Sequence, residues 1–168
     1  EIGIKSDLLD GQLRLNAAIF NTKYENLQRD TVVTVQDAAG NTFQETISAN
    51  EGDTTATGAE IEVTWVPTSN FRIDAHLGYL NHEYDSYEPI PGSDYSNLET
   101  PFSPKWNGGV SATFFQDVSN GSTLTYNLAL HYQDECELNP FPANGAELAA
   151  GNVVQKANTQ AESRTLLN

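Results

Sequence analysis

Ionisable side chains of the types that acid–base chemistry uses alternate with apolar residues in two neighbouring segments. They are Glu60 and Glu62 in the first segment and Arg72, Asp74 and His76 in the second, each two residues from the next. Side chains two residues apart lie on the same face of a β-strand, so these five belong to polar strand faces. Contact with water is a sufficient reason for ionisable residues on a strand face. We therefore predict no catalytic residue and no enzyme activity.

Histidine and cysteine lack the spacing of a metal site. His82 and His131 have no ligand-spaced partner, and Cys136, the single cysteine, stands among acidic residues. We interpret Cys136 as a loop thiol whose disulfide partner lies outside this sequence, with a free thiol as the next alternative. The sequence therefore predicts no metal and no cofactor, and leaves calcium or a cationic ligand at the acidic loops as an open alternative.

The polar residues are positioned by a predicted hairpin over residues 59–80. Its apolar face is formed by the residues that alternate with the polar ones: Ile61, Val63, Trp65, Phe71, Ile73, Ala75, Leu77 and Tyr79. Residues 66–70, Val-Pro-Thr-Ser-Asn, have the composition of a turn. This hairpin therefore has one apolar and one ionised face, and the same unit recurs along the chain.

Two further hairpins precede it. Asp10-Gly11 between strand-like residues predicts a two-residue turn, because both central positions of such a turn favour positive φ. Residues 12–36 and 42–66 form the arms of a long hairpin, each reaching roughly 80 Å at about 3.3 Å per residue. The apolar alternation changes parity near Ile19 or Phe20, which predicts either a bulge there or the end of the apolar section.

Strand character returns after an acidic loop, rich in Pro and Tyr, at residues 82–104. The next two strands have alternating apolar residues, which are Trp106, Val110, Ala112 and Phe114 in one and Leu124, Tyr126, Leu128, Leu130 and Tyr132 in the other. A short turn at 117–121 separates them, a second long loop covers 133–163, and residues 164–168 begin another strand. The prediction is about six strands plus part of a seventh.

Short and long connections alternate along the chain. The connections at 10–11, 67–70 and 117–121 are short, whereas those at 37–41 (by extension of its strands), 83–104 and 134–163 are long. Aromatic residues mark both ends of the apolar face: Trp65, Phe71 and Phe114 towards the short turns, and Tyr79, Trp106 and Tyr132 towards the long loops. We predict an all-β, antiparallel up-and-down meander, part of a transmembrane β-barrel with short turns at one end and long loops at the other.

Charge and hydropathy limit the alternatives. The chain has 23 Asp and Glu against 8 Lys and Arg, which argues against a nucleic-acid partner. Most of the acids, 16 of the 23, fall in residues 25–53, 83–99 and 134–162, the expected loops. No apolar run approaches the roughly 18 to 20 residues of a membrane helix, which excludes a helical span only. The alternative fold is a soluble β-sandwich that binds a ligand or carbohydrate.

Several motifs, in this order, resemble the C-terminal part of the β-barrel of TonB-dependent outer-membrane receptors. They are residues 1–16 (EIGIKSDLLDGQLRLN), 57–62 (TGAEIE), 78–80 (GYL) and 104–106 (PKW). The resemblance extends over nearly the whole chain, so we expect residues 1–168 to be a fragment of such a barrel. It implies a barrel of about 22 strands with an N-terminal plug domain in its lumen, and this plug is missing from the sequence.

The resemblance also implies the function. It predicts a receptor in the bacterial outer membrane that takes up a scarce nutrient, most simply a ferric siderophore or similar iron complex. The partners would be outer-membrane lipid, the plug domain, the inner-membrane protein TonB and a small-molecule substrate. The loop asymmetry places ligand binding at the long loops, where Tyr84, Tyr87, Tyr95 and Phe141 are the candidate contacts.

Overall fold

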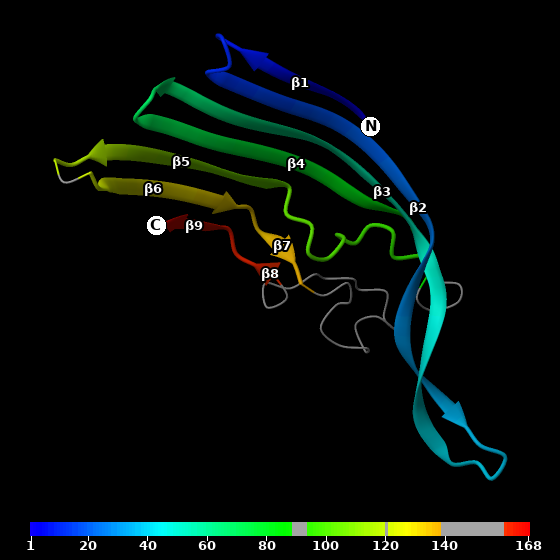
Figure 1. The fold of residues 1–168 in the computed structure, drawn as a ribbon. Coiled ribbons are helices and arrows are strands. Elements are labelled where there is room, and N and C mark those ends of the chain that lie inside the picture. The colour runs from blue at the N-terminus through cyan, green and yellow to red at the C-terminus, as the bar shows by residue number, and fades with distance from the viewer. Residues whose placement is uncertain (89–93, 120, 139–159) are drawn as a thin grey trace.

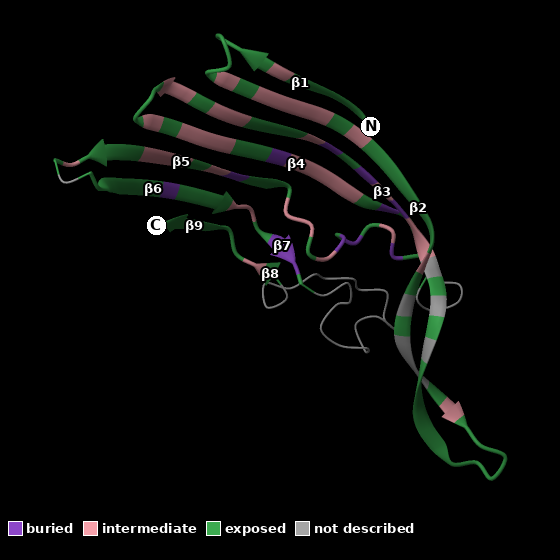
Figure 2. Cartoon of the chain, in the orientation of Figure 1, coloured by how far each residue is buried: buried purple, intermediate pink, exposed green. Residues whose placement is uncertain are grey.

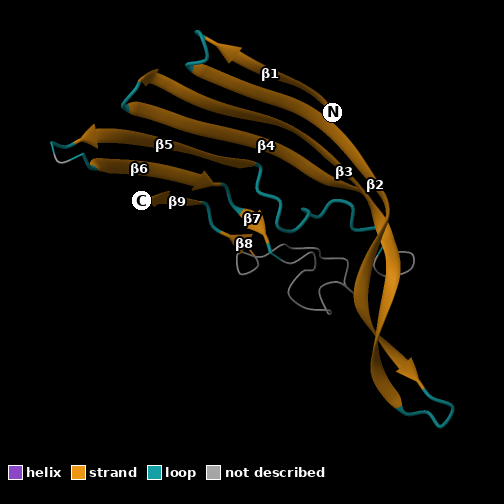
Figure 3. Cartoon of the chain, viewed as in Figure 1, coloured by secondary structure: helices purple, strands orange, loops and turns teal. Residues whose placement is uncertain are grey.

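The computed structural model describes residues 1–88, 94–119, 121–138 and 160–168, and every regular element in them is a β-strand (Figure 3). Seven strands form one sheet in the order β1-β2-β3-β4-β5-β6-β9 (Figure 1). Their bounds are β1 Ile2–Leu8, β2 Leu13–Gln36, β3 Thr42–Thr68, β4 Phe71–Tyr87, β5 Trp106–Asp117, β6 Thr123–Gln133 and β9 Arg164–Leu167. A separate two-stranded ribbon pairs β7 (Cys136–Glu137) with β8 (Gln160–Ala161).

The large sheet is a single curved layer (Figure 1). Every pairing between its neighbouring strands is antiparallel, and β1 and β9 form its two edges. Within the described residues, no second sheet packs face to face against it, so the structure does not support the β-sandwich alternative. We also find, in the same part of the chain, no helix with the length and apolarity needed to cross a membrane.

The strand register confirms the two predicted faces. Val63, Ala75, Val110 and Leu130 are paired in one row across four strands. Arg72, Thr113 and Asn127 form a row of opposite parity. Directly paired residues project to the same side of a sheet, so the first row belongs to a continuous apolar face and the second to a continuous polar face.

The first two of the three predicted short turns differ in detail from the prediction. The chain reverses at Asp10-Gly11, but the loop has four residues because Leu8 pairs with Leu13, and Leu9, Asp10 and Gly11 all have positive φ (53°, 55° and 85°). At the next turn, β3 continues to Thr68, and only Ser69 and Asn70 lie outside the strands. The ladder shifts register between Trp65 and Thr68, around Pro67, which has no N–H to donate.

Of the two explanations predicted for the change of parity near Ile19 or Phe20, the bulge is wrong. The ladder is regular there, with Ile19 paired to Ala59 and Phe20 to Gly58. Phe20 simply projects to the polar face and covers Gly58, where an added Cβ would lie 2.4 Å from the ring. The irregularity in β2 comes later, at residues 25–26, where Asn26 has a φ of 57°.

This irregularity belongs to a bend that crosses three strands. The Asn26 N–H donates to Asp53 Oδ1 (2.9 Å), and the Asp53 N–H donates to Ser86 Oγ (3.1 Å). Gly52 is required at the bend, because a Cβ there would lie 2.0 Å from the Ser86 carbonyl oxygen. Beyond this level β2 and β3 continue as a twisted ribbon that projects away from the sheet, as the long predicted hairpin requires (Figure 1).

Asp37 closes the tip of this ribbon. Its Oδ1 accepts the N–H groups of Ala39 (2.9 Å) and Asn41 (2.8 Å), and its Oδ2 accepts Asn41 Nδ2 (2.9 Å). Gly40 supplies the positive φ of 89°. The hydrogen bonds, first that from the Asn41 side chain, stabilise the ionised carboxylate and lower the pKa of Asp37.

Candidate functional site at the long-loop end of the sheet

Several connections meet at the end of the sheet where the long loops lie. They are the bend of β2 and β3, the end of β4, the segment 94–105 and the β7–β8 ribbon (Figure 1). The buried positions of the described residues are concentrated here, whereas the strands of the sheet are mainly exposed or intermediate (Figure 2). This end therefore has a small core of its own.

Three tyrosines make up most of that core. Tyr84, Tyr87 and Tyr95 pack with Leu98, all below 7% exposed, and Leu27 of β2 packs against them. We call this group the tyrosine cluster. The structure thus brings together three of the four residues that were predicted from the sequence to contact a ligand. The fourth, Phe141, lies outside the described residues.

Two of these tyrosines lie on a strand and not, as predicted, in the loop. β4 extends to Tyr87, where an extra residue, Asp85, separates Tyr84 and Ser86, which pair with consecutive residues of β3. In a regular strand Tyr84 and Tyr87 would point to opposite faces. The bulge shifts the alternation by one residue, and the two rings stack with centroids 4.5 Å apart and an interplanar angle of 9°.

Hydrogen bonds to backbone carbonyls of β4 hold the segment 94–105 over the end of this strand. The Tyr95 N–H donates to the Tyr87 carbonyl (2.9 Å), and Thr100 Oγ1 donates to the His82 carbonyl (2.8 Å). Asp94 begins the segment by accepting the Ser96 N–H (3.0 Å), a bond that lowers the pKa of the Asp94 carboxyl group. The segment is therefore held close to the sheet, and the buried tyrosines act as its support.

The exposure of the aromatic residues divides them by possible role. The buried rings of the tyrosine cluster, such as Tyr87 (0% exposed), support the loop. Contact between these tyrosines and a ligand stays a prediction. Phe102, a further aromatic residue of the segment 94–105, is 71% exposed and has a φ of 57°. Its N–H donates to the Glu137 carbonyl of β7 (2.7 Å). No alternation marks a single Phe in a loop rich in Pro, so the sequence gives no signal for it.

Other candidate residues also have definite places. His82 Nδ1 lies 3.0 Å from Ser103 Oγ, which ties β4 to the segment 94–105. Cys136 is a buried thiol on β7 and not in an open loop, and its pairing with a cysteine outside the sequence stays a prediction. Among the residues that the structure describes, no group of three or more His, Cys, Asp and Glu side chains is arranged to hold a metal ion.

Three of the ionised residues of the polar face, Glu62, Arg72 and Asp74, form hydrogen bonds with neighbouring side chains on that face. Arg72 donates to both carboxylate oxygens of Asp74, through Nε (2.7 Å) and Nη2 (2.6 Å), and Thr64 Oγ1 donates to Asp74 as well (2.9 Å). Asn16 Nδ2 donates to Glu62 Oε2 (3.2 Å). The carboxylates of Glu62 and Asp74 thus accept hydrogen bonds from neighbouring side chains, in agreement with a strand face that contacts water.

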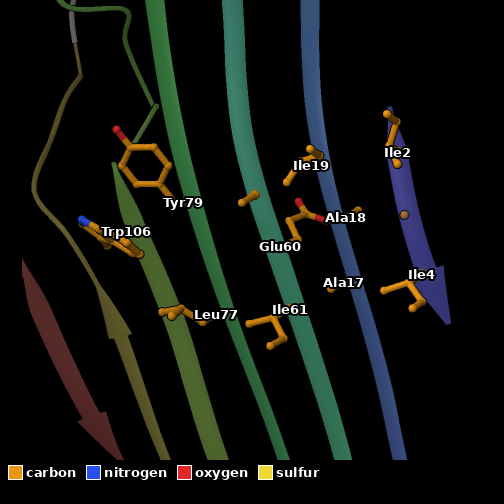
Figure 4. A pocket seen from close by; sticks show the side chains of 12 residues that line it. Ile2, Ile4, Ala17, Ala18, Ile19, Glu60, Ile61, Leu77, Tyr79 and Trp106 are labelled. Carbon is orange, nitrogen blue, oxygen red and sulfur yellow. The ribbon is translucent and has the colours of Figure 1, made fainter. Parts of the chain in front are cut away.

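Aromatic residues mark both ends of the apolar face, as predicted, although Trp65 (paired with Ile73) and Tyr132 (paired with Gly108) lie one row inside the outermost aromatic pairs. Tyr79 pairs with Trp106 at the long-loop end, with ring centroids 4.7 Å apart, and Phe71 pairs with Phe114 at the short-turn end. Near the first row lies a shallow depression of about 550 Å³ (Figure 4). Figure 4 shows Ile2, Ile4 and Ile19 on one side of it and Leu77, Tyr79 and Trp106 on the other. Its mainly apolar lining, which extends from the edge strand β1 to β5 on an uncovered sheet face, matches a surface that faces hydrocarbon.

The sequence model of the family described as "TonB dependent receptor-like, beta-barrel" matches residues 1–167. The chain belongs to this family. A solved structure of the siderophore receptor PiuA from Acinetobacter baumannii has the same fold over 98% of this chain, with a TM-score of 0.61 and 23% sequence identity. The chain spans 20% of the length of that receptor.

Membership in the TonB-dependent receptor family assigns the two faces of the sheet. These receptors are barrels of the bacterial outer membrane, and they transport solutes without catalysing a reaction. The apolar face of this receptor barrel therefore meets lipid, and the polar face lines the lumen. The tyrosine cluster, Phe102 and the projecting β2–β3 ribbon lie at the long-loop end, beyond the row of Tyr79 and Trp106.

Proposed function

We propose that this chain forms part of the wall of a receptor that takes up a ferric siderophore or a similar iron complex. The observation that carries the proposal is the family match over a sheet whose loops are long at one end only. Long loops supply the reach and variety that recognition requires, whereas the short turns offer little surface. The A. baumannii structure with the same fold is described as a siderophore receptor, and the choice of an iron complex as the nutrient in this proposal follows that description.

The proposal includes parts that lie outside this chain. β1 and β9 are open edges with unpaired backbone groups, which in hydrocarbon require neighbouring strands. We infer that residues 1–168 are a piece of a larger barrel, in which further strands close the wall. A plug domain would fill the lumen, and TonB at the inner membrane would supply the energy for transport.

The ligand, in this proposal, is bound at the long-loop end. The tyrosine cluster holds the segment 94–105 in place, and Phe102 offers an exposed ring on that segment. Tyr84, Tyr87 and Tyr95 remain candidates for contact if binding opens the cluster, and Phe141 remains one from the second long loop. In this proposal the tyrosine cluster supports the loop, and Phe102 is the ring that is exposed to the ligand.

Uptake by a strain that lacks its other iron receptors tests the proposal. Cells that make the full-length receptor would be given radioactive iron bound to a catecholate, a hydroxamate or a carboxylate siderophore. We expect uptake of one class, and at least about tenfold lower uptake after residues 88–99 are replaced by a short Gly-Ser linker. The matched control shortens the turn at 118–122, at the opposite end of the barrel, and should leave uptake unchanged.

Two results would contradict the proposal. Absence of uptake for all three classes, with the receptor folded in the outer membrane, would refute iron transport. Unchanged uptake after the 88–99 replacement would show that this loop only covers the barrel and that the ligand is recognised elsewhere.

A further inference from the structure

One area of the lumen wall is rich in hydrogen-bond donors. Its side chains come from four adjacent strands and surround a depression of about 220 Å³. They are His76 of β4, Asn107 of β5, His131 and Gln133 of β6, and Arg164 of β9. We call this group the donor patch.

The register explains why residues so distant in the sequence meet here. His76, Gly109 and His131 are consecutive partners across β4, β5 and β6. The next row towards the long loops contains Asn107, Gln133 and Arg164. Rows on the same face are about 6.6 Å apart, so side chains from both rows reach a single small group placed between them.

Gly109 makes the approach of the two histidines possible. Their ring centroids lie 6.1 Å apart across this strand position. A Cβ at residue 109 would lie 2.7 Å from His76 Cε1 and 2.8 Å from His131 Nδ1, so any other residue would push the rings apart. The glycine therefore leaves a hollow with an imidazole ring on each side.

The charge of the patch is opposite to that of the chain. The whole sequence has 23 acidic and 8 basic residues, yet no Asp or Glu is among the described residues that line this depression. Arg164 Nη2 donates to Gln133 Oε1 (2.9 Å), which uses one of the five guanidinium N–H groups. Two acids lie close by on the same face. Glu62, the partner of His76 on β3, accepts a hydrogen bond from Asn16 Nδ2 (3.2 Å), and Asp74, in the next row towards the short turns, accepts two from Arg72.

We propose that the donor patch binds an anionic oxygen group, a carboxylate or a phosphate, of a solute that passes through the lumen. Arg164 supplies the charge and two parallel N–H donors, which match the geometry of such a group. The side-chain amides of Asn107 and Gln133 and the imidazoles add further donors, since a neutral histidine still carries one N–H. The identification of this solute with the transported ligand rests on the proposed uptake function, but the anion binding itself does not.

Titration calorimetry of the purified full-length receptor tests the site, with inorganic phosphate and citrate as probes at moderate ionic strength. Arg164→Gln should weaken binding of both anions by about 10- to 100-fold, because hydrogen bonds to charged groups contribute this much. Arg164→Lys, which keeps the charge but loses the paired donors, should weaken it by about threefold to tenfold. Lys5→Gln removes one positive charge from the same face on β1 and should change affinity less than about twofold.

The outcomes separate the site from general electrostatics and from the transport proposal. Two results would overturn the donor patch as a site. One is that neither anion binds saturably to the wild type up to about 50 mM, and the other is that Arg164→Gln and Lys5→Gln lower the anion affinity equally. Heat-modifiable migration in gels checks that each variant is folded. His131→Gln provides a second test away from the edge strand β9 and should weaken anion binding by about threefold or more. Normal anion binding in a receptor that takes up no siderophore would refute the proposed function and leave this inference intact.

Discussion

Val110 provides the most direct test of which face meets lipid. It pairs with Ala75 in the middle of the three rows that lie between the aromatic pairs Phe71–Phe114 and Tyr79–Trp106. Four residues separate it from either aromatic row, which is about 14 Å along the strand and about 10 Å along the membrane normal for a tilt near 40°. Val110→Arg therefore puts a charge near the bilayer midplane, and we expect it to destabilise the full-length receptor by about 2–4 kcal/mol.

Two substitutions control for the size and charge of the arginine. Ser111, the next residue, projects into the lumen, where Asn127 donates to it (2.8 Å) and also to Thr113 (2.8 Å). Ser111→Arg loses only one of these bonds, and we expect a cost below about 1 kcal/mol. Leu124 lies on the lipid side but beyond the short-turn aromatic row, paired with Gln116, so Leu124→Arg should cost about 0–1 kcal/mol.

Equilibrium unfolding by guanidinium in the presence of lipid vesicles measures these differences. The shift of the midpoint multiplied by the slope m gives the change in the free energy of unfolding. The expected order of cost is Val110→Arg well above Ser111→Arg and Leu124→Arg. Equal costs at Val110 and Ser111 would mean that the two faces are not separated by lipid and water, and the assignment of the faces would be refuted.

Three further predictions concern the long-loop end. Gly52→Ala should cost about 1–3 kcal/mol and raise protease cleavage in the segment 94–105, since its Cβ would collide with the Ser86 carbonyl; unchanged cleavage would refute the close approach. Tyr87→Ala should remove about 3–5 kcal/mol of local packing and release the same segment, and hydrogen exchange that is unaltered at Tyr95 would contradict this. The pKa of Asp37 is lowered in the fold, so the Asp37 carboxylate stabilises the turn above its unfolded pKa, and this stabilisation is lost as the pH falls below about 4. Amide exchange at Asn41, whose N–H donates to Asp37, should therefore become faster at low pH, and Asp37→Asn should abolish this pH dependence.

The alternation of residue types was sufficient to predict the strands and their faces. The direction of a side chain on a strand is a local property of the backbone, so Ile61 and Glu62 are assigned to opposite faces without knowledge of their neighbours. The order of the strands followed from the connections, because adjacent antiparallel strands joined in series form a meander. The aromatic rows with Phe71 and Trp106 followed from strand length alone.

The candidate site could be predicted only in part. The sequence located it in the long loops and selected Tyr84, Tyr87 and Tyr95, which the structure brings together. It could not show that these rings are buried, because burial depends on how the segment 94–105 folds back over β4. It also placed Tyr84 and Tyr87 in a loop, since a bulge interrupts the alternation on which the strand prediction relied.

Only the tertiary structure decided which residues share a row across strands. A bulge such as that at Asp85 is defined by the pairing of two strands, and one extra residue reverses every later side chain. The donor patch depends on the same long-range register: His76 and Arg164 are far apart in sequence, and neither has a spacing that points to the other. Alternation along one strand determines the face on which a side chain lies, whereas its neighbours on that face are set by hydrogen bonds between strands, which local sequence does not encode.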